Sequence, residues 1–136
     1  MTAELYPAAT HDLAHMRREL APDAASAFND FSKAVFAAGA LPTKTKHIIA
    51  VAAAHITQCP YCIHGHTRAA LREGASDAEL MEAIWVAAEM RAGASYAHSL
   101  LALAEMNEAH SATEHQGEAV EKGDHDVVVA GEPRRS

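Results

Sequence analysis

The chain has 136 residues and a mass of 14.5 kDa, the size of one domain with a core of its own. Its 32 alanines far outnumber its three Phe, three Tyr and one Trp. Because alanine favours helices and disfavours strands, this composition excludes an all-β sandwich or barrel. The net charge of −7 offers no basic face to nucleic acid. No apolar stretch reaches the 18 residues that a membrane span needs.

The negative charge is concentrated at the C-terminal end. Residues 1–104 hold 10 acidic and 8 basic residues, a net charge of −2, whereas residues 105–136 hold 8 and 3, a net charge of −5. We interpret residues 111–136 as an acidic, disordered tail. At the other end, Glu4, His11, Asp12 and His15 lie where a signal peptide needs an apolar core. We therefore expect a cytoplasmic protein.

Six helices separated by Pro and Gly are predicted along the chain. Residues 1–22 form an N-terminal arm that contains a short helix, and residues 23–110 form one helical domain. Thr10 is the expected cap of the first helix, Gly39 the stop of the second and Thr43 the cap of the third. The sequence thus predicts an all-α, single-domain fold. The six predicted helices cover residues 11–20, 23–38, 44–58, 60–72, 77–91 and 94–110.

Apolar spacing predicts which helix faces are buried. Ser76 and Glu79 form a capping box that starts the helix at residue 77. Gly93 separates that helix from the last one. Trp85 and Met81 are expected in the core or in a contact between subunits, since a monomer this rich in alanine buries a thin core. The face predicted to be buried on the third helix consists of Ile48, Ile49, Ala52, Ala53 and Ile56.

The only two cysteines form a CxxC motif, Cys59-Pro60-Tyr61-Cys62. Pro60 suits the first turn of a helix and excludes Cys59 from the preceding one, so Cys59 is predicted at a helix N-cap. There the helix dipole and the free N–H groups favour a thiolate. His66 follows Cys62 by one helical turn, and at about 100° per residue the two thiols and this imidazole share one helix face.

The segments around this motif resemble a known family. They are residues 41–50 (LPTKTKHIIA), 59–71 (CPYCIHGHTRAAL) and 74–76 (GAS). Together they resemble the carboxymuconolactone decarboxylase superfamily, and within it the alkylhydroperoxidase D-like branch with its CxxCxxxH core. The resemblance covers roughly residues 25–105.

The resemblance implies an all-helical fold that assembles into homo-oligomers, either trimers or hexamers. It also implies reduction of a small hydroperoxide by a CxxC pair that cycles between dithiol and disulfide, without a cofactor and with an external thiol or disulfide reductant. Cys59 and Cys62 match the redox pair, and His66 matches the histidine of a proton relay. The decarboxylase branch does not rely on this pair, so decarboxylation is not expected.

Two positions depart from the family pattern. His47 stands where the relay usually has a glutamate, twelve residues before the first cysteine, and Tyr61 stands where some members have a second histidine. His47 lies on the stripe of the third helix that leads to Cys59, so its imidazole is predicted to replace the carboxylate as the proton acceptor.

Several alternatives stay open at the level of sequence. Cys62 is the expected attacking thiol because His66 is one turn away, whereas the N-cap position argues equally for Cys59. His47, Cys59, Cys62 and His66 also supply the two sulfurs and two nitrogens of a tetrahedral zinc site. A third interpretation is a non-catalytic helical oligomer with inert thiols.

Overall fold

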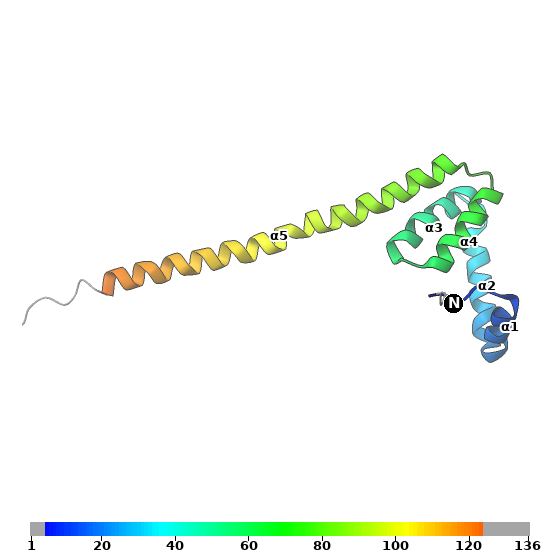
Figure 1. The fold of residues 1–136 in the computed structure, drawn as a ribbon, viewed down its shortest axis with the longest axis horizontal. Helices are drawn as coiled ribbons and strands as arrows, with labels where there is room; N and C mark the ends of the chain where they lie inside the picture. The colour runs from blue at the N-terminus through cyan, green and yellow to red at the C-terminus, as the bar shows by residue number, and fades with distance from the viewer. Residues whose placement is uncertain (1–4, 124–136) are drawn as a thin grey trace, which may run out of the picture. The chain divides into compact units, whose positions relative to one another are not determined.

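The computed structural model describes the backbone of residues 5–123 and the side chains of residues 5–113. This part of the chain contains five helices and no strand, which confirms the all-α prediction (Figure 1). It belongs to two compact units, residues 1–91 and 92–136. The helices are α1 (His11–Leu20), α2 (Pro22–Phe36), α3 (Thr43–Thr57), α4 (Pro60–Arg72) and α5 (Asp77–Gly123).

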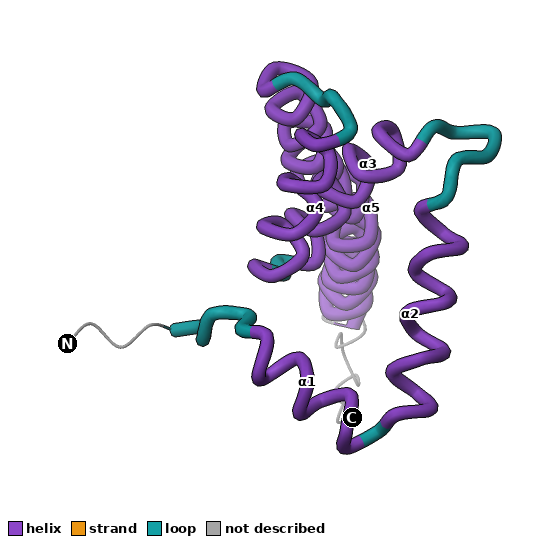
Figure 2. Tube along the Cα trace, turned by 90° about the vertical axis from the view of Figure 1, so that its right-hand side faces the viewer, coloured by secondary structure: helices purple, strands orange, loops and turns teal. Residues whose placement is uncertain are grey.

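Helices α1 and α2 are connected by the single residue Ala21 and diverge from it in a V (Figure 2). The Thr10 hydroxyl accepts a hydrogen bond from the Leu13 N–H at 3.3 Å, so Thr10 caps α1 as predicted. Pro22 starts α2, where its missing N–H costs no hydrogen bond. The predicted stop at Gly39 is wrong, because α2 ends at Phe36 and Ala37 already has extended backbone angles.

Helices α3 and α4 pack side by side (Figure 1), and each contributes one residue to the buried core cluster of residues 1–91. The core consists of Val51, Ala70, Ala75 and Leu80, with Ile48 and Ile84 packed against it. The predicted buried face of α3 is therefore only partly correct. Ile48 contributes to the core, whereas Ile49 and Ile56 are 51% and 45% exposed. The buried stripe includes Val51 and Ala54, one step round the helix.

The turn between α3 and α4 has an unusual backbone. Gln58 has φ 55° and ψ 45°, in the left-handed region, and it is the only residue other than glycine with positive φ in the described part of the chain. With its amide oxygen facing Arg91, Gln58 accepts hydrogen bonds from both terminal nitrogens of that side chain, at 2.9 and 3.3 Å. This turn places Cys59 at the N-cap of α4.

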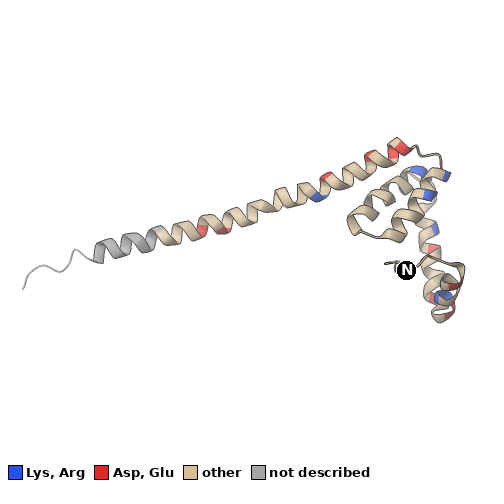
Figure 3. Cartoon of the chain, in the orientation of Figure 1, with Lys and Arg blue, Asp and Glu red and all other residues tan. Residues whose placement is uncertain are grey.

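Helix α5 combines the fifth and sixth predicted helices. The capping box at its start is confirmed, since Ser76 Oγ accepts from the Glu79 N–H and Glu79 Oε2 accepts from the Ser76 N–H. Gly93 does not break the helix, because the alanines and leucines on either side favour its continuation. The two acidic residues of its first turn are visible in Figure 3.

The helix also continues beyond residue 110, where the sequence predicted its end. Residues 111–123 of the predicted disordered tail are helical, since the Ala, Glu and Gln residues of this stretch favour a helix despite Gly117. Residues 124–136, including the three consecutive valines at 127–129, lie outside the described residues. The predicted domain boundaries at 22 and 110 stay predictions.

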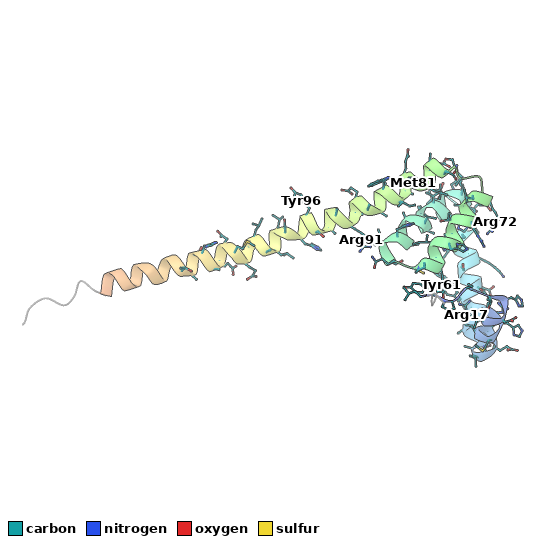
Figure 4. All side chains as sticks on the ribbon, viewed as in Figure 1. Arg17, Tyr61, Arg72, Met81, Arg91 and Tyr96 are labelled. Carbon is teal, nitrogen blue, oxygen red and sulfur yellow. The ribbon has the colours of Figure 1, made fainter. Side chains whose placement is uncertain are left out.

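Long apolar side chains remain on the surface of each unit. In residues 1–91 they include Phe28, Phe31 and Trp85, which are 67%, 63% and 69% exposed. In residues 92–113 they include Tyr96 and Leu100. Figure 4 shows Met81 and Tyr96 projecting from α5. Among the described residues, no helix is both long enough and apolar enough to cross a bilayer.

Candidate functional site

The two cysteines lie at the start of α4, and their environments differ. Cys59 Sγ accepts a hydrogen bond from the Cys62 N–H at 3.3 Å, which is the contact of a side chain at a helix N-cap. Cys62 lies in the first turn, and its side chain is exposed. Both cysteines are free thiols in this structure. Their placement agrees with the prediction that the motif opens a helix.

This geometry makes Cys59 the more acidic thiol. Hydrogen bonds from the Cys62 side chain and from its backbone N–H lower the pKa of Cys59. The same side-chain hydrogen bond raises the pKa of Cys62, because it is Cys62 that donates, and partial desolvation of this exposed thiol raises it further. The first proton is therefore lost from Cys59. Cys62 keeps its proton until another base removes it.

A pair of imidazoles lies beside this turn of α4. Nδ1 of His47, on α3, is 3.1 Å from Nδ1 of His66, on α4. A hydrogen bond between these atoms requires one of them to carry a proton and the other to have none. Burial lowers the pKa of His47, and the charges of His66 and Arg72 lower it further, against an opposing effect of Glu73. His47 is thus held in the neutral form that accepts a proton.

The aromatic ring of Phe36 covers both imidazoles. Its centroid is 4.5 Å from that of His47 with an angle of 8° between the planes, and 4.9 Å from that of His66 with an angle of 27°. No role for Phe36 was predicted from the sequence. The signal available in the sequence was its position at the end of a helix that shortly precedes His47.

The pair and one cysteine line a common cavity. This cavity, of about 440 Å³, is bordered by α2, α3 and α4 and brings Cys62, His47 and His66 to one space. Its remaining wall is mainly apolar. Cys59 is absent from the lining. The apolar part of the wall includes Phe28, Phe31, Val35, Phe36 and Ala69.

The geometry gives no support to the zinc alternative. Across the part of the chain with described side chains, no three His, Cys, Asp or Glu residues are placed to hold a metal ion. The reason is local. The Nδ1 atoms of His47 and His66 face each other in a hydrogen bond, and Cys59 Sγ is bonded to the Cys62 N–H.

Tyr61, between the two cysteines, lines the same cavity, and its hydroxyl reaches the N-terminal arm. Its hydroxyl donates to the Pro7 carbonyl at 2.8 Å, and its ring meets that of Tyr6 edge to face at 6.1 Å. Tyr61 also borders a second hollow, together with Thr10 and with Arg17 of α1. Tyr61 and Arg17 are labelled in Figure 4. Nothing local in the sequence connects residues 7 and 61, so this contact was not predictable from the sequence.

A second histidine of α3, His55, forms a hydrogen bond within its own helix. His55 Nδ1 donates to the Val51 carbonyl at 2.8 Å. His55 is therefore a packed histidine with a hydrogen-bond partner in its own helix.

Comparison with known proteins places this site in a family context. The model of the carboxymuconolactone decarboxylase family matches residues 22–105. An uncharacterized protein encoded in the cox locus of Paracoccus denitrificans is 63% identical over 82 residues, which are 60% of this chain and 74% of that protein. An uncharacterized protein of Cupriavidus necator is 41% identical over 83 residues, again 60% and 74% of the two chains.

Solved structures with a similar fold come from a bacterium and an archaeon. A carboxymuconolactone decarboxylase family protein of Legionella pneumophila, solved in its apo form, superposes with a TM-score of 0.54 and 37% identity over 58% of this chain and 70% of that one. A protein of Methanobacterium thermoautotrophicum gives a TM-score of 0.57 and 36% identity over 60% and 91% of the two chains.

Proposed function

We propose that this chain, which belongs to the carboxymuconolactone decarboxylase family, is a thiol peroxidase and disulfide oxidoreductase of the alkylhydroperoxidase D-like type. The observation that carries the proposal is the cavity in which Cys62 shares its lining with the His47–His66 pair. A thiol with a raised pKa needs a base to become a nucleophile, and a neutral imidazole pair supplies one.

In the proposed first step, Cys62 attacks a hydroperoxide in the cavity. The pair takes the proton of the Cys62 thiol, the thiolate attacks the terminal peroxide oxygen, and the O–O bond breaks. The proton then goes to the departing alkoxide, so that ROOH becomes ROH and Cys62 becomes a sulfenic acid. Acidity alone would favour Cys59. We assign the attack to Cys62 because it is the sulfur that lines the cavity with the bases.

In the proposed second step, Cys59 resolves the sulfenic acid. Its lowered pKa makes it a ready thiolate, and it lies at the N-cap three residues before Cys62, within the distance that a disulfide can span. Attack on the sulfenic sulfur forms the disulfide and releases water once a proton is added. An external dithiol then supplies two electrons and two protons to restore the pair. We place this cycle in the cytoplasm, where such dithiols are kept reduced.

Single-turnover oxidation tests the proposal. One equivalent of cumene hydroperoxide should lower the mass of the reduced chain by two hydrogens within seconds, and the loss should map to the segment with both cysteines. The Cys59→Ser variant should stop at the sulfenic acid, which dimedone traps. The Cys62→Ser variant should react at the rate of a free thiol. Overoxidation of one cysteine without a disulfide, or equal rates in both variants, would contradict the mechanism.

The assembly is also a proposal. Apolar side chains such as Phe28, Phe31 and Trp85 expose more than half of their surface, more than a stable monomer usually leaves in contact with water. We propose that copies of this chain cover them in a trimer or hexamer.

A further inference from the structure

The end of α2 is fastened to the start of α3 by three hydrogen bonds. The Thr43 hydroxyl donates to the Phe36 carbonyl at 3.0 Å. Lys46 Nζ donates to the carbonyls of Val35 at 2.8 Å and Ala37 at 2.6 Å, on either side of Phe36. These bonds satisfy carbonyl groups that a helix end leaves without partners. They also fix the backbone from which the Phe36 ring extends.

The fixed ring lies against two imidazoles from two other helices. Phe36 stacks on His47 and on His66, and the centroids of the two imidazoles are themselves 5.4 Å apart. Phe36 also lines the cavity that contains Cys62. Each stacked face excludes water from the imidazole that it covers. The ring therefore restricts the rotation of both side chains at once.

We propose that Phe36 is a positioning residue that holds His47 and His66 in contact through their Nδ1 atoms, so that the two imidazoles are protonated in two separate steps. The proposal rests on the proposed function only where it states that this pair serves Cys62. Its physical basis is the 3.1 Å contact. That contact is favourable with one shared proton between the two Nδ1 atoms and unfavourable when both carry one.

The charged groups around the pair are few. At the C-terminal end of α4, the C-cap residue Glu73 raises and Arg72 lowers the pKa of His47, and the Cys62 thiol of α4 lines the same cavity. From α2 the pair meets the uncharged Phe36 ring. On α3 the neighbouring ammonium of Lys46 is bonded to two carbonyls of the α2 end. Of these interactions, the one that depends on Phe36 is the contact between the two imidazoles, because the ring stacks on both of them.

Nuclear magnetic resonance titration of the imidazoles tests this role without any peroxide. In the parent chain, signals assigned through His47→Gln and His66→Gln variants should show two steps separated by more than about 1 pH unit. Phe36→Leu should bring the two steps together, because the imidazoles lose their common platform and water reaches them. Phe36→Tyr, which keeps an aromatic face, should retain the separation of the parent.

Phe28→Leu is the matched control. Phe28 lines the same cavity but its ring contact is with Phe31, so the same substitution there should leave the titration unchanged. If Phe36→Leu lowers the helix content, Phe36→Met provides a second aliphatic variant with greater bulk. Independent titration of the two imidazoles in the parent, or an unchanged separation in both aliphatic variants, would overturn the proposal.

A second measurement connects the pair to the reaction. Phe36→Leu should move the acid limb of Cys62 oxidation by the same number of pH units as it moves the titration of the pair. If the chain reduces no peroxide but its imidazoles titrate as expected, the positioning role of Phe36 stands and the proposed function fails. The two ideas are therefore separable.

Discussion

Cys59 and Cys62 are three residues apart but face different electrostatic environments. Hydrogen bonds from Cys62 lower the pKa of Cys59, whereas donating one of them raises the pKa of Cys62. We therefore predict that alkylation by iodoacetamide, which follows the thiolate fraction, is half-maximal at a lower pH for Cys59 than for Cys62. Single-thiol variants, Cys62→Ser and Cys59→Ser, allow each pH profile to be measured separately.

The serine in Cys62→Ser keeps a side-chain donor and the backbone N–H that bond to Cys59. This variant should therefore retain most of the lowering of the Cys59 pKa. A Cys62→Ala variant, which keeps the backbone N–H but removes the side-chain donor, should move the Cys59 profile toward higher pH. Equal profiles in all three variants would show that the contacts at the N-cap do not control the acidity of the thiol.

His47 makes a second prediction at the scale of one residue. Burial and the charge of His66 lower its pKa, so its neutral form persists below the ordinary value near 6.5. If His47 is the base, His47→Ala should slow thiol oxidation by about 10²–10⁴-fold. His47→Glu should keep much of the rate and move the acid limb toward lower pH. An Ala variant that reacts at the parental rate would leave His47 without a catalytic role.

The same lowered pKa sets the direction of a stability effect. Because the folded chain binds this proton less readily than the unfolded chain, His47 makes the free energy of unfolding fall as pH decreases through the interval between 6.5 and its lowered pKa. Urea unfolding of the parent and of His47→Gln across this interval measures the effect. The parent should show the steeper loss.

At the scale of elements, Tyr61 joins the N-terminal arm to the redox motif. Its hydroxyl donates to the Pro7 carbonyl, and Tyr6 meets its ring. We predict that Tyr61→Phe, which removes only the hydroxyl, increases proteolytic cleavage before α1 while leaving the helix content unchanged. Limited proteolysis followed by N-terminal sequencing measures this. Tyr6→Phe is the control, since it retains both rings and the bond to Pro7, and it should cleave like the parent.

The helices near the motif were predictable because their boundaries are determined locally. The bounds of α1 and α4 match the sequence prediction, since Thr10 and Cys59 cap them and prolines mark the adjoining positions. The continuous α5 was missed because a single glycine was interpreted as a break. Its cost of about 1 kcal/mol is small beside the propensity of the surrounding residues.

The candidate site was predictable in part for a related reason. His66 and the cysteines share one helix, so spacing along α4 brought them together, and the stripe of α3 that includes His47 led toward them. The contact of His47 with His66, and the Phe36 ring over both, depend on how three helices pack. No local pattern in the sequence contains that information.

At the scale of the whole molecule, the exposed apolar surface predicts association. Light scattering at micromolar concentration should give a mass of three or six times 14.5 kDa. The chain has one tryptophan, Trp85, which is 69% exposed in the single copy, so its fluorescence reports directly on burial by a neighbour. We expect Trp85→Lys to shift the population toward smaller species. A mass near that of one chain would contradict the proposed assembly.

The Glu79 carboxylate, described above as part of a helix cap, has a wider consequence. Besides the Ser76 N–H, it accepts a hydrogen bond from Lys44 Nζ at 2.9 Å, and Lys44 lies in the first turn of α3. The group that defines where α5 begins thus also anchors that beginning to the start of a helix 35 residues earlier in the chain. A capping motif formed by neighbouring residues therefore also makes a long-range contact. This contact closes the segment of chain that contains the buried residues of α3 and α4.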